Sequence, residues 1–179
     1  MHLVQAITIV LILQRLTELA LSRRNAARAF QRGAVEHGRE HYWMFVVLHV
    51  GWIIGLNLEW SLGSRELPSW WMPAAVLTVV LQFARYWVIR TLGEAWNTRI
   101  ITWPEMKIVR SGPYQWVRHP NYIIVALELA IIPLMVGSVV TAVAATVVNA
   151  FILLLVRIPA ETRALAQSAE GRSPVADRA

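Results

Sequence analysis

The sequence predicts an all-α integral membrane protein, built as a bundle of five transmembrane helices. The chain is 56% hydrophobic with a mean hydropathy of +0.47. Only 16% of its residues are charged, against roughly 25% in soluble domains. Several apolar runs reach roughly 20 residues, the length that crosses the hydrocarbon core. We therefore expect one membrane domain over residues 1–167, followed by a small polar tail over 168–179 that frays.

The five expected spans follow from the apolar runs. They cover residues 3–21, 42–62, 70–89, 121–136 and 139–156. Only Gly137 and Ser138 separate the last two spans, which predicts a tight helical hairpin. Pro133 is expected to kink the fourth span. The first run lacks a basic flank and is too long for the apolar part of a signal peptide, so no cleavable signal is expected.

The basic residues predict the orientation of the bundle. They lie between spans one and two, between spans three and four, and after span five. The connections on the other side contain only Arg65. The positive-inside rule therefore places the N-terminus outside and the C-terminus in the cytoplasm. We assign the net charge of +6 to this topology and to contact with anionic membrane lipids, and expect no nucleic-acid partner.

The connection between spans three and four is long for a loop. Residues 91–119 include Trp96, Trp103 and Trp116, which predicts a packed cytoplasmic cap over the bundle. Residues 157–167 are expected to continue the fifth helix into this cap.

Residues 112–122, with the sequence GPYQWVRHPNY, form a polar and aromatic block between apolar segments. Pro113 and Pro120 disfavour helix in the residues that precede them, so His119 is expected to be extended. Pro120 suits the first turn of the fourth helix. A helix N-terminus attracts anionic groups such as a carboxylate. The polar residues expected to cluster there are Arg118, His119, Asn121 and Tyr122. His119 is either a general base or a residue that orients the loop.

Ionisable residues inside the spans are costly, and they are usually paired or functional. Arg15 and Glu18 are three residues apart, which favours an ion pair facing the bundle. Arg85 either joins a site or extends its charge to the membrane surface. Glu128 lies two turns from Asn121 on the same face, and either binds a cation or pairs with Arg15 or Arg85.

A second polar group follows span five. Arg157 and Glu161 are spaced i, i+4, and Asn149 lies about two turns earlier. One interpretation is an exposed ion pair of little energetic value. The other places both residues beside His119, because the hairpin brings these helix ends together. An acid there could bind an ammonium group or ribose hydroxyls, and an arginine could bind a carboxylate.

The sequence lacks the motifs of several other kinds of functional site. With no Cys there is no thiolate metal site or cysteine nucleophile, and His37 and His41 lack spaced partners for zinc. We therefore expect no metal. The glycine-rich phosphate loops and the serine-hydrolase elbow are also missing from the sequence.

The chain resembles the isoprenylcysteine carboxyl methyltransferase family over residues 80–167. The resemblance is carried by Gly112-Pro113-Tyr114, residues 117–122, Glu128, Arg157-Ile158 and Glu161. Residues 92–100 also resemble a bacterial branch often associated with type III polyketide synthases. Members of that branch methylate hydroxyls of long-chain phenolic or pyrone lipids.

The resemblance implies an S-adenosylmethionine-dependent methyltransferase whose cofactor binds at the cytoplasmic ends of the last two spans. It implies a bacterial plasma-membrane enzyme with a lipid-like acceptor, and no obligate protein partner is inferred. The implied cofactor-binding residues are Tyr114, Arg118, His119, Pro120, Tyr122 and Glu161. The implied catalytic residues are Arg157, Asn149 and His119, and those implied to contact the acceptor are Glu128, Arg85, Trp96 and Asn97. The family often has two adjacent acids where this chain has Glu161 and Thr162, so one polar contact is lost.

The acceptor stays open between a prenylcysteine-like carboxylate, a phenolic or pyrone hydroxyl and a phospholipid amine. The resemblance of residues 96–99 to the bacterial branch favours a hydroxyl acceptor. An ionised carboxylate needs no base, whereas a phenol, with a pKa of about 10, needs proton removal by His119 or Glu161. The competing functions are a phospholipid N-methyltransferase, an NADPH-dependent membrane reductase of related fold and a non-catalytic membrane scaffold.

Overall fold

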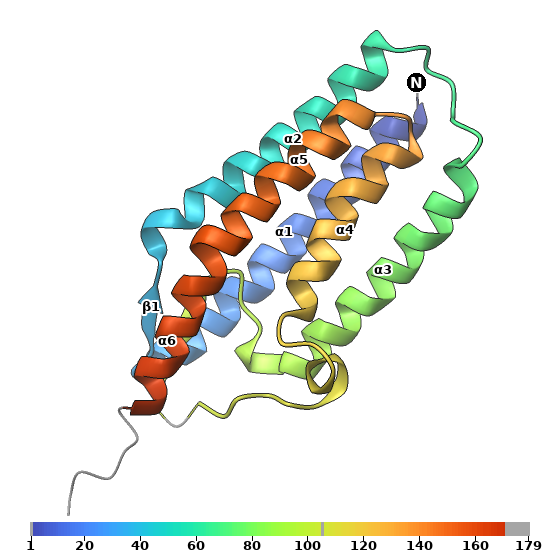
Figure 1. Cartoon of the computed structure of the whole chain (residues 1–179). Coiled ribbons are helices and arrows are strands. Elements are labelled where there is room, and N and C mark those ends of the chain that lie inside the picture. The colour runs from blue at the N-terminus through green and yellow to red at the C-terminus, as the bar shows by residue number, and fades with distance from the viewer. Residues whose placement is uncertain (1, 105, 171–179) are drawn as a thin grey trace, which may run out of the picture.

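The computed structural model describes residues 2–104 and 106–170, and most of this part of the chain is helical. The helices pack along one another in an elongated bundle, with the N-terminus at one end and α6 at the other (Figure 1). A π-helical turn, Ile152–Arg157, joins α5 to α6 without a break. The helices are α1 (His2–Gln31), α2 (Tyr42–Leu62), α3 (Trp71–Leu92), α4 (Pro120–Met135), α5 (Val139–Phe151) and α6 (Ile158–Glu170).

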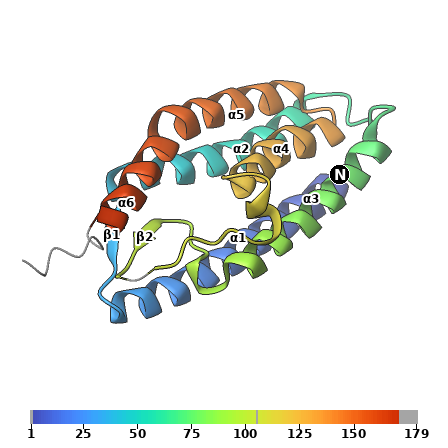
Figure 2. The same ribbon diagram turned by 60° about the horizontal axis from the view of Figure 1, so that its bottom comes forward.

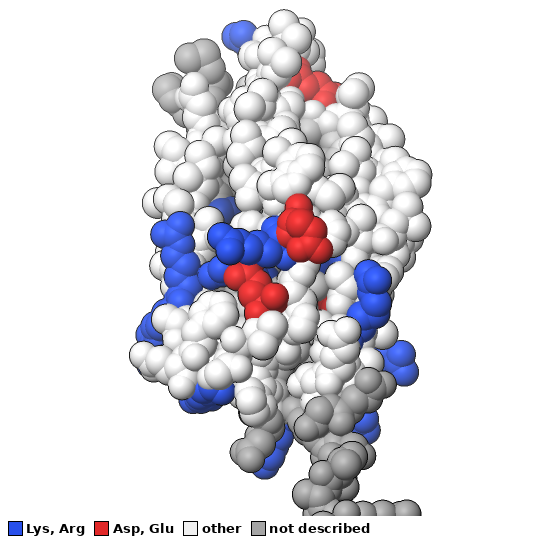
Figure 3. All heavy atoms as spheres, turned by 90° about the vertical axis from the view of Figure 1, so that its left-hand side faces the viewer, with Lys and Arg blue, Asp and Glu red and all other residues white. Residues whose placement is uncertain are grey.

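Four helical stretches in the described residues are long and apolar enough to cross a membrane. They are α1, α2, α3 and the continuous stretch of α5 and α6. The fifth expected span, α4, is apolar but has 16 residues, or about 24 Å of helix against a hydrocarbon core of about 30 Å. Charged side chains gather toward the α6 end of the molecule, and most of the remaining face is uncharged (Figure 3). These features support an integral membrane protein.

The expectation of an all-α fold was incomplete. Two short strands, β1 (Val35–His37) and β2 (Ile100–Thr102), pair antiparallel with Glu36 opposite Ile101. Helix α1 also ends at Gln31 rather than near residue 21. Ala26 and Ala29 are buried against Ile101 of β2, so small side chains let the helix continue beyond the expected span and pack on this strand.

The segment after α3, over residues 91–104 and 106–119, crosses the end of the bundle between α1 and α6, as Figure 2 shows. Asn25 of α1 fixes this segment by donating to the carbonyls of Gly93 (3.1 Å) and Trp96 (2.8 Å). The Trp96 side chain is buried against Val88 and Ile124. The expected cap of packed tryptophans was wrong for Trp116, which is 69% exposed and contacts Trp87 edge to face.

Ion pairs hold the outside of the cap to α1. Glu94 accepts hydrogen bonds from Arg32 (2.6 Å) and Arg28 (3.3 Å). The hydrogen bond from Arg32 is the main reason that the pKa of Glu94 is lowered.

The hydrophobic core lies where α1, α2, α4 and α5 meet, and includes Leu56, Leu129 and Ile132. The indole of Trp52 donates to the Leu129 carbonyl of α4 at 3.1 Å. Pro133 lies in the last turn of α4, and its carbonyl accepts from the Ser138 amide at 2.9 Å, which closes the hairpin.

Gly112, at the start of the GPYQWVRHPNY block, occupies a position that admits no side chain. Its φ is +56°, and a Cβ there would lie 2.7 Å from Thr91 Oγ1. We expect Gly112→Ala to lower the free energy of unfolding by about 1–3 kcal/mol, measured by thermal unfolding in detergent. Gly51→Ala on α2 is the control, because a Cβ there meets no atom within 4 Å. Equal melting temperatures for the two variants would contradict this prediction.

Candidate active site

The polar block places its residues at the start of α4, as the sequence predicts. Residues Gly112–Gln115 form a 3₁₀ turn, and Pro120 occupies the first turn of α4. His119 precedes the helix with φ −130° and ψ 60°, outside the helical region. This geometry turns the side chains of α4's first turn toward α6.

Tyr122 joins α4 to the helix that follows α5. Its hydroxyl donates to the Glu161 carboxylate and accepts from Arg157 Nε at 2.9 Å. The His119 ring stacks on Tyr122 with centroids 5.2 Å apart, and His119 Nδ1 lies 4.0 Å from Glu161 Oε2. We call His119, Tyr122, Arg157 and Glu161 the Tyr122 cluster. Arg157 and Glu161 are therefore bridged by a tyrosine, and the interpretation as a simple exposed pair was wrong.

Arg157 is 9% exposed and is oriented from several sides. Its Nη2 donates to the Thr98 carbonyl of the cap at 3.1 Å, and its guanidinium lies 5.8 Å from the centre of the Phe45 ring. It is the last residue of the π-helical turn, a distortion that is frequent at functional sites.

Thr98 is held in turn by α1 through its amide and hydroxyl groups. Ser22 Oγ accepts from the Thr98 amide at 3.2 Å, and it also lies 2.9 Å from Thr98 Oγ1. Ser22 is 2% exposed. The first helix thus positions an arginine that lies 135 residues later in the chain.

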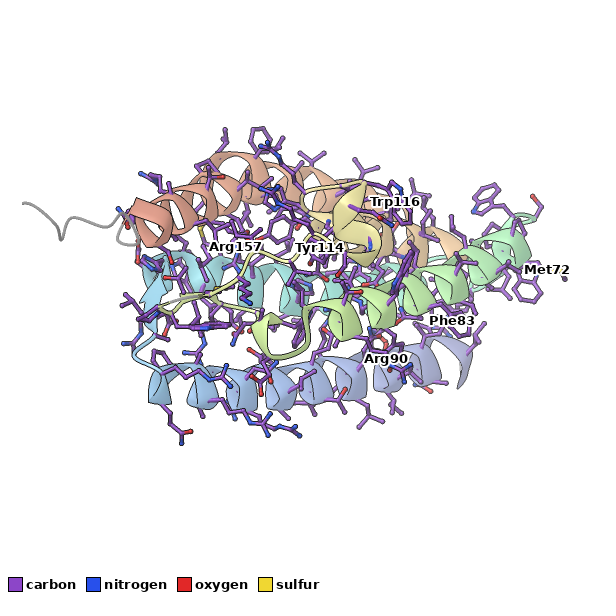
Figure 4. All side chains as sticks on the ribbon, turned by 90° about the horizontal axis from the view of Figure 1, so that it is seen from below. Met72, Phe83, Arg90, Tyr114, Trp116 and Arg157 are labelled. Carbon is purple, nitrogen blue, oxygen red and sulfur yellow. The ribbon has the colours of Figure 1, made fainter. Side chains whose placement is uncertain are left out.

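Two further residues of the block differ in their surroundings. Tyr114 lies within the space that the helices enclose, as does Arg157 (Figure 4). Burial, and then the charge of Glu161, raise the pKa of Tyr114, so its phenol stays neutral. Arg118 is exposed, and within the described residues its side chain has no hydrogen bond or ion pair.

Asn149 on α5 is a buried amide without a partner. It is fully buried, and neither its oxygen nor its nitrogen is hydrogen-bonded to a described residue. Asn121 Oδ1, in the first turn of α4, is in the same state. An unsatisfied buried polar group costs about 1–3 kcal/mol, so these atoms are suited to a ligand or water.

The ionisable residues of the spans form a separate group. Arg15, Glu18, Arg85 and Glu128, which we call the quartet, connect α1, α3 and α4. Arg85 Nε donates to Glu128 at 2.8 Å, and Arg15 Nη1 donates to Glu18 at 2.7 Å. Arg85 is 2% exposed, so the interpretation that it extends to the membrane surface was wrong. In the described residues, no hydrogen bond or ion pair links the quartet to the Tyr122 cluster.

Comparison with known proteins decides the family. The sequence profile of the isoprenylcysteine carboxyl methyltransferase (ICMT) family matches residues 74–167. The uncharacterized protein YpbQ of Bacillus subtilis (strain 168) is 39% identical over 156 residues, covering 87% of this chain and 92% of its own length. The chain belongs to the isoprenylcysteine carboxyl methyltransferase family.

A more distant relative of this ICMT-family protein is an uncharacterized protein of Haemophilus influenzae (strain ATCC 51907 / DSM 11121 / KW20 / Rd). It is 29% identical over 126 residues, or 69% of each chain. A search of solved structures found no significant match. The family indicates a membrane methyltransferase.

The ICMT-family match includes every residue predicted for the site, but their surroundings differ. Pro120 is buried at the start of α4, beside the Tyr122 cluster in sequence. Trp96 is part of the core under the cap, and Asn97 bonds to Ser22 of α1 through both amide atoms (2.7 and 3.1 Å). The acceptor role predicted for Trp96, Asn97, Arg85 and Glu128 stays a prediction. The side chains of Asn97, Arg85 and Glu128 are already hydrogen-bonded within the protein.

Sequence reasoning missed the residues around Arg157 that come from other parts of the chain. Phe45 looked like one more apolar residue of a span, and Ser22 lies just beyond the expected end of the first span. Thr98 lies inside the segment that resembles the bacterial branch, which was the available signal.

Proposed function

We propose that this ICMT-family protein is an S-adenosylmethionine-dependent O-methyltransferase that acts on an amphipathic, lipid-like acceptor. The reaction is a direct displacement at the boundary between the membrane and the cytoplasm. The observation that carries the proposal is the Tyr122 hydroxyl, which is held between the Glu161 carboxylate and the Arg157 guanidinium. This cluster joins the two helices that the family motif marks.

The residues of the cluster fit the cofactor chemically. Glu161 supplies a carboxylate for an ammonium group or ribose hydroxyls, and the unpartnered Asn121 Oδ1 supplies a further acceptor. The stacked rings of His119 and Tyr122 supply aromatic surface, which attracts cationic groups. When bound, S-adenosylmethionine supplies an electrophilic sulfonium methyl group.

The protein's own contribution is then mainly alignment. Good orientation alone is worth about 7–11 kcal/mol of activation free energy. Arg157 is suited to this role because its guanidinium is fixed by Tyr122, Thr98 and Phe45. We infer a bacterial plasma-membrane location with the Tyr122 cluster facing the cytoplasm, because the arginine-rich segments lie at that end.

Ligand titration tests the cofactor. We expect calorimetry of the purified protein in detergent to detect S-adenosylmethionine binding and no NADPH binding. Incubation with methyl-labelled S-adenosylmethionine should transfer the label into a bacterial lipid extract. NADPH binding without S-adenosylmethionine binding would favour a reductase, and absence of label in any lipid would refute methyl transfer.

Glu161→Gln is expected to weaken S-adenosylmethionine binding about 10- to 100-fold. It keeps the shape of the side chain but removes the charge, and a hydrogen bond to a charged group is worth about 1.5–3 kcal/mol. Calorimetric affinity is the measurement. Thr162→Ala is the matched control, since Thr162 is exposed and bonds only to the Ile158 carbonyl. Equal affinity in both variants would remove Glu161 from the cofactor site.

A further inference from the structure

A small cavity borders Arg157, and most of its other lining residues have no role in the proposed function. Its volume is about 10 Å³, which is room for about one water-sized group. Arg157 therefore belongs both to the Tyr122 cluster and to the wall of this cavity. The lining also includes Gly38, His41, Tyr42, Phe45 and Ile100.

His41 supplies the imidazole of this wall, and its charged neighbour is Glu40. His41 Nδ1 is buried and has no hydrogen bond with a described residue. The Glu40 carboxylate lies 3.5 Å from the same nitrogen. The side chain as a whole is 36% exposed, so a proton that reaches it can pass on to water.

Gly38 contributes only backbone to this wall. Gly38 has φ +64°, and a Cβ built there would lie 3.5 Å from His41 Nδ1 and 3.8 Å from Ala160. Tyr42 completes the wall and bonds to Thr98 Oγ1 at 3.3 Å. The wall of the cavity thus contains an imidazole and a fixed guanidinium, a combination suited to an oxygen that loses a proton.

We propose that His41 is the general base of the reaction and that the acceptor's hydroxyl oxygen occupies this cavity. The inference rests on the proposed methyltransferase function. As the oxygen forms its bond to the methyl carbon, the carbon–sulfur bond breaks and its electron pair stays on sulfur. The hydroxyl proton moves to His41 Nδ1, so the products are a neutral ether, a neutral thioether and an imidazolium. Arg157 holds the oxygen while its negative charge develops.

This role predicts a dependence on the acidity of the acceptor. A phenol with a pKa of about 10 must lose its proton during transfer, whereas a nitrophenol is ionised near neutral pH and needs no base. Positioned general bases contribute about 10²–10⁴-fold to rate. His41→Gln should therefore slow methylation of 3-pentadecylphenol about 100-fold or more, and methylation of its 4-nitro derivative only a few-fold.

His37→Gln is the matched control. His37 lies four residues earlier on β1, and its Nε2 is already bonded to Thr102 Oγ1 at 2.9 Å. The His37→Gln variant should methylate both phenols at the wild-type rate. A second readout needs no turnover: in the absence of cofactor, His41→Gln should bind 3-pentadecylphenol several-fold more weakly than wild type in calorimetry. Added imidazole should partly restore transfer by His41→Ala.

The outcomes separate this inference from the proposed function. If wild type does not bind S-adenosylmethionine, the proposed function itself fails. If wild type binds it but methylates only a carboxylate probe such as farnesylthioacetate, or none of the probes, the inference is overturned. Equal slowing of both phenols by His41→Gln, or no slowing of either, also overturns it, because a base must discriminate between them.

Discussion

Glu128→Ala is expected to destabilise the protein by about 3–5 kcal/mol, the largest stability effect predicted for a single substitution. Glu128 is 1% exposed and accepts from Arg85, from Arg15 (3.2 Å) and from Gln82 (3.1 Å). The quartet contains two arginines and two glutamates, so it is electrically balanced. Removing one acid leaves the buried Arg85 guanidinium and the partly buried Arg15 guanidinium facing a single carboxylate.

The measurement is equilibrium unfolding in detergent or bicelles. Arg85→Met combined with Glu128→Leu is the informative second variant, because it removes one charge of each sign and leaves Arg15 paired with Glu18. Replacing a buried ion pair by apolar residues is often neutral or stabilising. We expect the double variant to regain most of the stability that Glu128→Ala loses.

Glu94→Ala serves as the exposed control, since its partners Arg28 and Arg32 are in contact with water. It should change stability little. A Glu128→Ala protein as stable as wild type, or a double variant no more stable than the single one, would show that the quartet's charge balance does not stabilise the bundle.

The quartet also illustrates the limits of reading the chain without its structure. Helical spacing placed Arg15 beside Glu18, and the cost of buried charge indicated that Glu128 has a partner. The sequence named Arg15 and Arg85 as alternative partners, and Glu128 pairs with both, although Arg15 and Glu128 are 113 residues apart. Arg85 lies near the predicted end of a span, where extension to the surface is common, so its burial depended on a contact with another helix.

The meeting of the two polar groups was predictable for a local reason. The turn at Gly137 and Ser138 forces α4 and α5 to run antiparallel, so the start of α4 meets the region after α5. Tyr122 and Glu161 are in contact for that reason. The surroundings of the Arg157 side chain were less predictable, because Phe45, Thr98 and Ser22 come from three separate segments and carry no shared motif.

The predicted element boundaries were wrong where packing beyond the expected spans decided them. Hydropathy ended the first span near residue 21, but small alanines carry α1 on to Gln31. The strands β1 and β2 have three residues each, too few for a periodic pattern. Their pairing is a consequence of the cap packing against α1, which local sequence does not encode.

Arg157→Lys is expected to reduce methyl transfer about 100- to 10,000-fold, the largest effect on activity. Arg157 uses two nitrogens at once, donating to the Tyr122 hydroxyl and to the Thr98 carbonyl. A lysine keeps the charge but is a point charge that cannot reproduce this planar geometry. Two hydrogen bonds to a charged group, at about 1.5–3 kcal/mol each, give the range.

Turnover with labelled S-adenosylmethionine measures the loss, and the melting temperature shows that the variant is folded. Arg163→Lys is the control, because Arg163 lies less than two turns further on α6, is exposed, and bonds only to the Pro159 carbonyl. Tyr122→Phe adds a second test. Since Arg157 acts partly through the Tyr122 hydroxyl, the double variant should lose less activity than the product of the two single losses. Strictly multiplicative losses, or an Arg157→Lys enzyme within a few-fold of wild type, would mean that Arg157 and Tyr122 do not work as one unit.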